Sequence, residues 1–539
     1  MATLLHDFIF EAAQRAPGTP ALSYSAAYPT AYPARSRLLS YAELARCVRD
    51  CASALLSLGL RRAERVAVYL EKCPENVTAM FATAAAGAVF VPVNPLLKPQ
   101  QVAYILADCN VSVLVTSRER LAQLAPALAA CPDLRTIVVT GNQLDEHPAS
   151  ALPQVAWTSL LAAGADIPMA PHAVIDTDMS AILYTSGSTG RPKGVVLSHR
   201  NMVTGALSVA SYLRNTPEDR ILCVLPFSFD YGLSQLTTAF ASGACAVLMN
   251  YLLLRDIIET VEQEAITGLA AVPPLWIQLS QLSWPLSSPL RYITNSGGVM
   301  QRSTIEHLRL SLPRTQIFLM YGLTEAFRST YLAPEQLERR PDSIGRAIPN
   351  AEVLVLRPDG SVCEADEPGE LVHRGALVAL GYWNDAVRTA ERFKPLPPQV
   401  TGLVVPELAV WSGDTVRRDA DGYLYFVGRS DDMIKTSGYR VSPAEIEEVV
   451  YASGLVGEAA ALGVPHPVLG AAIALLVTAA PGMELNRDAL LATCRLRLPS
   501  YMVPAYIVIR GDCLPRNPNG KIDRPLLAAE LAAAYGDHT

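Results

Sequence analysis

Glycines, hydroxyl side chains and one lysine are concentrated in the segment YTSGSTGRPKGVVLSH, residues 184–199. Glycine lets the backbone approach an oxyanion closely, hydroxyl groups donate hydrogen bonds, and a lysine supplies a positive charge. The apolar runs AILY and VVL on either side predict two strands. We interpret the segment as a phosphate-binding turn between strands, and its candidate binding residues are Thr185, Ser186, Gly187, Ser188, Thr189, Gly190 and Lys193.

The spacing of this turn differs from that of the ATP-binding P-loop, G-x-x-x-x-G-K-S/T, which opens a helix. Here two residues, Arg191 and Pro192, separate Gly190 from Lys193. Turns rich in glycine and serine often do no more than connect two elements. The number of hydroxyl groups and the lysine at the end of the run favour the binding interpretation.

A sheet is needed to position such a turn, and helix and strand patterns alternate along most of the chain. The segment NVTAMFATAAAGAVFVPVN combines a small-residue helix with a strand, and QVAYILADCNVSVLVTS repeats the pattern. Alternation of this kind predicts parallel sheets covered by helices. We expect one doubly wound half up to about residue 170 and a second half from about residue 201.

A β-rich character replaces this alternation from about residue 342, where turn pairs such as Asp359-Gly360 join short strand patterns. After about residue 430, a polar segment leads into a helix and a further α+β pattern. The predicted fold class is α/β. We expect a large N-terminal domain of doubly wound sheets plus a β-rich subdomain, residues 1–430, and a small α+β C-terminal domain, residues 431–539.

The overall composition disfavours several classes of function. The net charge is -7 with 18% charged residues and no polybasic tract, so we expect no nucleic-acid partner. The ten cysteines form no CxxC pair or zinc-type cluster, which indicates reduced thiols and no structural metal. The apolar run LGAAIALLVTAA is shorter than the roughly 20 residues that span a bilayer. We therefore expect a cytoplasmic protein without a membrane span.

Six short motifs follow one another along the chain: YTSGSTGRPKG, NSGG at 295–298, YGLTEA at 321–326, SGD at 412–414, GRSDDMIKTSGYRVSPAEIE from Gly428, and PRNPNGKID from Pro515. In this order they resemble the AMP-forming adenylating enzymes, the superfamily of acyl-CoA synthetases, peptide-synthetase adenylation domains and luciferases. The resemblance extends over nearly the whole chain. The wording of YGLTEAFRSTYL and GELVHRGALVALGYWN is also similar to stand-alone acyl ligases of bacterial exosortase and exopolysaccharide gene clusters.

This resemblance implies an acid–thiol ligase that uses ATP and Mg²⁺. A carboxylate would attack the α-phosphate of ATP to give acyl-AMP and pyrophosphate, and a thiol would then displace AMP. The thiol would belong to CoA or to the phosphopantetheine of a carrier protein. Because fewer than 20 residues follow Lys521, we expect any carrier protein to be a separate chain.

The resemblance also implies roles for individual residues, although each one taken singly is more often part of a strand end or a turn. Lys521 would bridge the carboxylate and the phosphate, because attack of one anion on another needs cations. Glu325 would bind magnesium, with Thr324 beside it reaching phosphate. The nucleotide would meet Tyr321 stacked on adenine, Gly297 and Gly298 against the base, Asp414 on the ribose hydroxyls, and Arg429 near the ribose or phosphate.

A mobile C-terminal domain is a further implication of the resemblance. In this superfamily the domain rotates between the two half-reactions, because the lysine needed for adenylation would obstruct the thiol. Asp431 matches the hinge position. In the thiolation arrangement, Lys435 and Gly438 would face the site, and Gly438 would keep the pantetheine tunnel open because a side chain would fill it.

The pocket for the acyl group is the least determined part of the site. Asp230 follows Phe229 as in amino-acid-activating domains, where the aspartate holds the substrate's α-ammonium, but it would serve equally well as a helix N-cap. Arg328 could bind a second carboxylate or a polar tail, although an ion pair within the protein is the more usual role. The other candidate pocket residues are Tyr231, Ser234, Met320 and Ser329.

A small carboxylic or amino acid fits this partly polar pocket better than a long chain. The first alternative is a medium- or long-chain fatty acyl ligase, which the absence of a histidine-containing motif in this region disfavours. An oxidative, luciferase-like enzyme and a non-catalytic nucleotide-binding regulatory protein are the others. The presence of Lys193, Glu325, Asp414 and Lys521 argues against the last of these.

Overall fold

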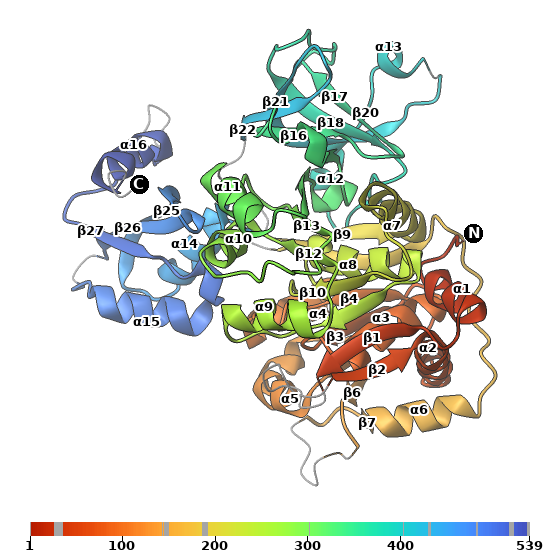
Figure 1. Ribbon diagram of the computed structural model, residues 1–539. Coiled ribbons are helices and arrows are strands. Elements are labelled where there is room, and N and C mark those ends of the chain that lie inside the picture. The colour runs from red at the N-terminus through yellow and green to blue at the C-terminus, as the bar shows by residue number, and fades with distance from the viewer. Residues whose placement is uncertain are drawn as a thin grey trace.

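Three sheets organise the chain in the computed structural model (Figure 1). The structure describes residues 2–25, 36–142, 144, 150–185, 192–300, 302–402, 404–429, 433–480, 483–516 and 522–535. Two of the sheets belong to the larger N-terminal part and the third to a smaller C-terminal part, drawn in blue in Figure 1. The predicted α/β class, with a large N-terminal part of sheets and a smaller C-terminal part, is confirmed.

The first sheet has eight strands, and those from β8 to β7 are parallel to one another. Two antiparallel strands, β9 and β19, close one edge. In sheet order the strands are β19 (Gly381–Tyr382), β9 (Lys193–Ser198), β8 (Met179–Thr185), β4 (Val89–Pro92), β3 (Arg65–Tyr69), β5 (Val111–Thr116), β6 (Thr136–Val139) and β7 (Gln154–Ala156).

The second sheet has fourteen strands and includes the β-rich segment at the top of Figure 1. Its order is β17 (Ala351–Leu356), β18 (Gly369–Gly375), β21 (Leu408–Arg418), β22 (Leu424–Arg429), β16 (Ser343–Ala347), β15 (Thr330–Leu332), β14 (Gln316–Tyr321), β13 (Tyr292–Asn295), β12 (Gly268–Ala271), β10 (Arg220–Cys223), β11 (Cys245–Leu248), β1 (Pro20–Ser25) and β2 (Ser36–Ser40), with β20 (Phe393–Pro395) beside β21.

The third sheet forms the C-terminal module, the described residues from 433 to 535. Its strands are β24 (Tyr439–Val441), β23 (Ile434–Thr436), β26 (Gly470–Ala479) and β25 (Val456–His466), with β27 (Tyr506–Arg510) beside β26. Two buried apolar clusters lie entirely within this module. The predicted domain boundary between residues 430 and 431 lies outside the described residues and stays a prediction.

Helices lie beside the strands of the two large sheets (Figure 1). None of the described helices is long and apolar enough to cross a membrane. The helices are α1 (Asp7–Arg15), α2 (Tyr41–Ser57), α3 (Pro74–Ala85), α4 (Pro99–Asp108), α5 (Arg118–Leu124), α6 (Trp157–Ala165), α7 (His199–Leu213), α8 (Asp230–Ser242), α9 (Leu254–Gln263), α10 (Pro273–Ser280), α11 (Arg302–Ser311), α12 (Ala386–Arg392), α13 (Pro398–Thr401), α14 (Pro443–Tyr451), α15 (Arg487–Arg497) and α16 (Arg524–Tyr535), with 3₁₀ turns η1 (Ala125–Ala130), η2 (Thr324–Ala326), η3 (Pro334–Gln336) and η4 (Ser500–Met502).

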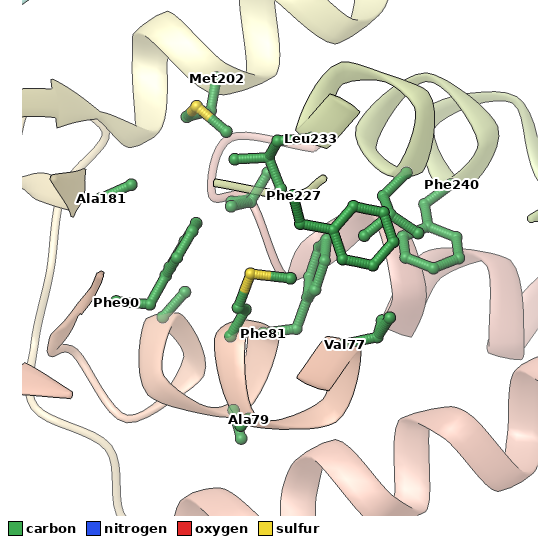
Figure 2. Close-up of a cluster of buried hydrophobic side chains, with 14 of the residues drawn as sticks. Val77, Ala79, Phe81, Phe90, Ala181, Met202, Phe227, Leu233 and Phe240 are labelled. Carbon is green, nitrogen blue, oxygen red and sulfur yellow. The ribbon is translucent and has the colours of Figure 1, made fainter. Parts of the chain in front are cut away.

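An aromatic core joins the two large sheets (Figure 2). Helix α3 packs on β3 and β4, helix α8 packs on β10 and β11, and Phe81 of α3 meets Phe240 of α8 edge to face at 5.2 Å. Both rings are fully buried, and burial of such a side chain is worth about 1.5–3 kcal/mol. This core fixes the two sheets relative to each other, and with them the strand ends that carry the site.

The division of the large part by chain order needs correction. Strands β1 and β2 precede residue 170 but belong to the second sheet, because β1 runs parallel to β11 with Leu22 opposite Ala246. Strands β8 and β9 follow residue 170 and belong to the first sheet. The β-rich segment is also hydrogen-bonded to the second sheet through β15 and β16. Pairing between strand edges, which chain order does not reveal, decides the sheet to which each strand belongs.

Candidate functional site

Three buried polar side chains meet between the two large sheets. Lys193 begins β9, Tyr382 lies on the neighbouring strand β19, and Glu325 lies on η2 just after β14. Lys193 Nζ is 2.9 Å from Glu325 Oε1 and 2.6 Å from the Tyr382 hydroxyl, which donates to Glu325 Oε1 at 2.6 Å. The Ser198 side chain accepts from the backbone of α7 and fixes where β9 ends. The sheets therefore hold one cation, one carboxylate and one phenol together.

Charge keeps this cluster ionised although it is buried. Burial opposes ionisation of Glu325, but Lys193, Arg440 and the Tyr382 hydroxyl together hold the pKa of Glu325 well below its usual value. Burial lowers the pKa of Lys193, and Glu325 opposes that shift. A desolvated ion pair is a strong local source of charge for binding a polyanion or a metal cation. Glu325 lines a pocket together with Thr185, Thr324 and Arg440, and Lys193 lies next to this pocket through its contact with Glu325.

A second polar contact lies in the wall of this pocket. The Tyr321 hydroxyl, at the end of β14, donates to Asp414 Oδ2 on β21 at 2.5 Å. Both side chains are buried and line the pocket. The neighbouring Ser412 hydroxyl accepts from the backbone N–H of Asp414 at 3.1 Å and so orients this part of β21. The sequence placed Tyr321 and Asp414 in one site, and the structure brings them into direct contact.

The predicted phosphate-binding turn is described only at its two ends. Strands β8 and β9 pair antiparallel with Thr185 opposite Lys193, as expected for a turn between strands. The Thr185 hydroxyl is buried and has no hydrogen-bond partner among the described atoms. The other predicted turn residues, Ser186, Gly187, Ser188, Thr189 and Gly190, lie outside the described residues.

The two glycines after β13 have different surroundings. Gly297 lines the pocket, and a Cβ there would lie 3.2 Å from Val272 and 3.7 Å from the Gly438 carbonyl oxygen. Gly298 instead faces Pro273, 3.0 Å from an added Cβ, and is not among the residues that line the pocket. Arg429 pairs through its backbone with Asp414 in the β21–β22 ladder.

The C-terminal module reaches into the same pocket through the hairpin β23–β24. Lys435 and Gly438 line the pocket beside Tyr321 and Asp414. Gly438 has a φ of +80°, and a Cβ there would lie 2.7 Å from a methyl group of Val272. The hairpin can therefore sit against Val272 only with glycine at this position. The predicted hinge Asp431 and the predicted bridging Lys521 lie outside the described residues.

Glu445 of α14 is a buried carboxylic acid at the contact between the module and the large part. Gln101 of α4 donates to its Oε1 at 3.2 Å, while Oε2 has no hydrogen-bond partner among the described atoms. Burial, with a further contribution from Glu448, raises the pKa of Glu445 to about 7 against the hydrogen bond from Gln101. The contact therefore favours the protonated acid.

A pH-dependent contact between module and large part follows from Glu445. A carboxyl whose pKa rises from 4.5 to about 7 on closure binds extra protons in that range, so closure weakens as the pH rises from 4.5 to 7 and then levels off. The free energy of closure that is lost in this way approaches about 3 kcal/mol. Hydrogen exchange of the β23–β24 hairpin should be faster at pH 8 in the wild type than in Glu445→Gln, and the difference should disappear at about pH 4, below the pKa of the exposed acid. Equal exchange at both pH values would contradict this expectation.

The predicted acyl-pocket residues fall into three groups. Asp230 and Arg328 line the main pocket, and Arg328 with Tyr231, Ser234 and Met320 also lines a smaller inner cavity behind it. Ser329 lines neither space, because its hydroxyl is buried 3.0 Å from His373 Nδ1. The placement of Ser329 in the pocket is therefore wrong.

Asp230 is not an N-cap, contrary to one of its two predicted roles. The N-cap position of α8 is Phe229, and Asp230 is the first helical residue. Its Oδ2 lies 3.7 Å from Arg328 Nη1, and both side chains are almost fully buried. Burial raises the pKa of Asp230, and Arg328 opposes that shift.

Tyr382, Arg440 and Glu445 are among the polar residues of the site that sequence reasoning missed. Tyr382 lies in the segment GYWN, for which the resemblance implies no site residue. Pairing of β19 with β9, far apart in sequence, brings its hydroxyl to Lys193. Arg440 and Glu445 stand in the GYRVSPAEIE motif, and only the packing of the module against the large part shows that they reach the pocket.

Comparisons with known proteins agree with this architecture. Residues 9–383 match the model of the AMP-binding enzyme family, and residues 445–521 match the AMP-binding enzyme C-terminal domain. An indoleacetate–CoA ligase from Aromatoleum aromaticum is 31% identical over 90% of this chain and 92% of that protein. An L-proline–[L-prolyl-carrier protein] ligase from Streptomyces coelicolor is 33% identical over 90% and 91%.

Larger proteins and a solved structure extend the similarity. The chain spans only 6% and 10% of the length of linear gramicidin synthase subunits C and D from Brevibacillus parabrevis, at 30% and 29% identity over 91% and 98% of the chain. An amide bond synthetase from Marinactinospora thermotolerans has the same fold, with a TM-score of 0.84, 23% identity, and coverage of 98% of this chain and 99% of that one. The chain therefore belongs to the AMP-binding enzyme family.

Proposed function

We propose that this protein is an ATP-dependent, AMP-forming ligase that activates a small carboxylic acid and transfers the acyl group to a thiol. The observation that carries the proposal is the convergence of the Lys193–Glu325–Tyr382 cluster, the Tyr321–Asp414 pair and the β23–β24 hairpin on one pocket. Relatives with similar length are ligases for CoA or for a carrier protein. Both kinds of ligase end in a thioester.

In the first half-reaction, a carboxylate oxygen attacks the α-phosphorus of ATP, and the bond to the bridging oxygen of pyrophosphate breaks. Lys193 supplies positive charge for the outgoing phosphates, and Lys521 would bridge the two reacting anions. Tyr321 and Asp414 hold the adenosine, with Tyr321 against the base and Asp414 toward the ribose.

Glu325 fits a magnesium site, because its neighbours keep the buried carboxylate ionised, and carboxylate oxygen is a preferred Mg²⁺ ligand. Magnesium would supply charge neutralisation on the phosphates when bound. Thr324, beside Glu325 and lining the same pocket, would reach a phosphate oxygen. Lys193 and Tyr382 hold Glu325 in position for this contact.

In the second half-reaction, the thiol sulfur attacks the acyl carbon, the thiol proton is released, and the bond from the acyl carbon to AMP breaks. The hairpin with Lys435 and Gly438 is already in the pocket, as this half-reaction requires under the proposed rotation about Asp431. Gly438 leaves the approach beside Val272 free of a side chain. The structure thus has the arrangement that we assign to thiolation.

The acceptor thiol is proposed to belong to CoA or to a separate acyl or peptidyl carrier protein. Both kinds of acceptor occur in the names of relatives that match over 92% and 91% of their length. All ten cysteines are free, which suits the reducing conditions of the cytoplasm, the location that we propose.

A pyrophosphate-exchange screen tests the proposal. Labelled pyrophosphate is incubated with the protein, ATP, Mg²⁺ and single acids drawn from amino acids, hydroxy acids, dicarboxylic acids and fatty acids. Label should enter ATP with at least one small acid, and thioester should then form when CoA or a phosphopantetheinylated carrier is added. Absence of exchange with every acid would contradict the proposal and support a non-catalytic nucleotide-binding role.

A further inference from the structure

Arg328 carries an unused hydrogen-bonding edge inside the protein. The residue is 1% exposed, and its Nε and Nη2 atoms have no hydrogen-bond partner among the described residues. A buried guanidinium that leaves donors unpaired costs several kcal/mol unless a ligand supplies the acceptors. An arginine in this state, at the boundary of the main pocket and the inner cavity, points to a missing acceptor.

The contact with Asp230 does not satisfy this arginine. Asp230 Oδ2 is 3.7 Å from Nη1, beyond hydrogen-bond distance. The face of the guanidinium rests on the Tyr231 ring, 4.6 Å from its centroid, and contributes a cation–π contact but no hydrogen bond. Asp230 therefore balances part of the charge and leaves the fork formed by Nε and Nη2 open.

The same edge binds carboxylates elsewhere in the molecule. Arg200 holds Asp176 through Nε at 2.7 Å and Nη2 at 3.0 Å, and Arg291 holds Asp219 through Nε at 3.2 Å and Nη2 at 2.7 Å. Two parallel hydrogen bonds to the two oxygens of one carboxylate match the planar fork. The open fork of Arg328 has the geometry to receive one more carboxylate.

The backbone fixes Arg328 at this position. Phe327, the residue before it, is fully buried with a φ of +55°, a conformation that costs a non-glycine residue of order 1–3 kcal/mol. Its ring fits against Gly205 of α7, where a Cβ would lie 2.5 Å from a ring carbon. The strained turn sends Arg328 toward Asp230 and the pocket, rather than toward solvent. Such strain is typical of functional positions.

From this geometry we infer that Arg328 binds a second, distal carboxylate of the substrate, so that the ligase selects a small dicarboxylic acid. The inference rests on the proposed function and specifies its substrate class. An α-ammonium group at Asp230 would lie close to the guanidinium, and repulsion between the two cations disfavours amino acids. Arg328 and the small cavity behind it also leave little space for a long acyl chain.

A matched panel of acids tests the inference by pyrophosphate exchange. Malonate, succinate, glutarate and adipate are compared with propionate, butyrate, valerate and hexanoate, together with the natural amino acids. The wild type should prefer the best dicarboxylate over its monocarboxylate of equal length by about 100-fold in kcat/KM. Equal rates for both, or preference for an amino acid, would overturn the inference while leaving the ligase function intact.

Variants separate the fork from general damage to the pocket. In Arg328→Met/Asp230→Asn, both buried charges are removed together, so the protein should fold, and the preference should fall to within about threefold. Arg328→Lys keeps the charge but loses the fork, and most of the preference should also disappear. Arg200→Met, which breaks an exposed fork of the same kind, should leave the preference unchanged.

The outcomes distinguish the two levels of the proposal. A double variant that still prefers dicarboxylates would show that Arg328 does not bind the distal group. Exchange with no acid of any class in the wild type would contradict the proposed function, and the inference with it. The inference would be supported most directly if the double variant gained pyrophosphate exchange with monocarboxylates and gained none with dicarboxylates.

Discussion

Replacing Glu325 with glutamine is expected to reduce pyrophosphate exchange about 100- to 1,000-fold. The substitution keeps the shape of the side chain but removes the charge that we assign to magnesium binding. It also leaves the buried Lys193 ammonium without its carboxylate, 2.9 Å away in the wild type. Removal of one partner of a buried ion pair costs about 3–5 kcal/mol, so the free energy of unfolding should fall by that order.

A double variant distinguishes the catalytic loss from the stability loss. In Lys193→Met/Glu325→Gln, neither buried charge remains, and much of the lost unfolding free energy should return because no uncompensated ion is left. Exchange should stay at the level of the single variant or below it. Denaturant unfolding and exchange assays measure the two effects separately. Normal exchange in Glu325→Gln would exclude Glu325 from the reaction.

Replacing Gly438 with valine is expected to reduce thioester formation from acyl-AMP about 100-fold while exchange stays within about threefold of the wild type. Valine at a φ of +80° is strained, and its Cβ would lie 2.7 Å from Val272. The backbone strain and the clash with Val272 should both keep the β23–β24 hairpin out of the pocket. Adenylation, which we assign to a different position of the module, does not need that contact.

Gly454→Val is the matched control for this substitution. Gly454 lies in the same module with a φ of +71°, but a Cβ there meets no atom within 4 Å. Its backbone strain is therefore similar, without a clash at the pocket. Both half-reactions should stay within about threefold of the wild type. Equal thioester formation in Gly438→Val and Gly454→Val would show that the hairpin contact is not needed for thiolation.

Local patterns in the sequence predicted the strands around the site well. They predicted less well which strands pair with one another and which side chains come into contact. The apolar runs beside the glycine-rich turn predicted β8 and β9, because hydrophobic periodicity is a local signal. The resemblance brought Lys193, Glu325, Tyr321 and Asp414 together in one site, and the structure places them around one pocket. The narrower resemblance to exosortase-associated ligases stays a prediction.

Contacts between residues far apart in the chain could not be predicted from the sequence, because they depend on how strands and loops pack. Tyr382 reaches Lys193 only because β19 pairs with β9 across nearly 190 residues. Strand β1 likewise joins β11 with Leu22 opposite Ala246, more than 200 residues further along the chain. Ser329 is predicted as a residue of the acyl pocket, yet the chain turns its hydroxyl toward His373. The open fork of Arg328 depends on the φ of Phe327, and no pattern of residue types reveals that angle.

Glu445 also makes closure of the C-terminal module a proton-uptake step. Near pH 7, the acid is about half protonated when it is buried and almost fully ionised when it is exposed, so closure takes up about half a proton from the buffer. The heat of any ligand binding that shifts the module would then depend on the ionisation enthalpy of the buffer. Calorimetry in phosphate and in Tris would give different apparent enthalpies for the same closure, and Glu445→Gln would give the same value in both.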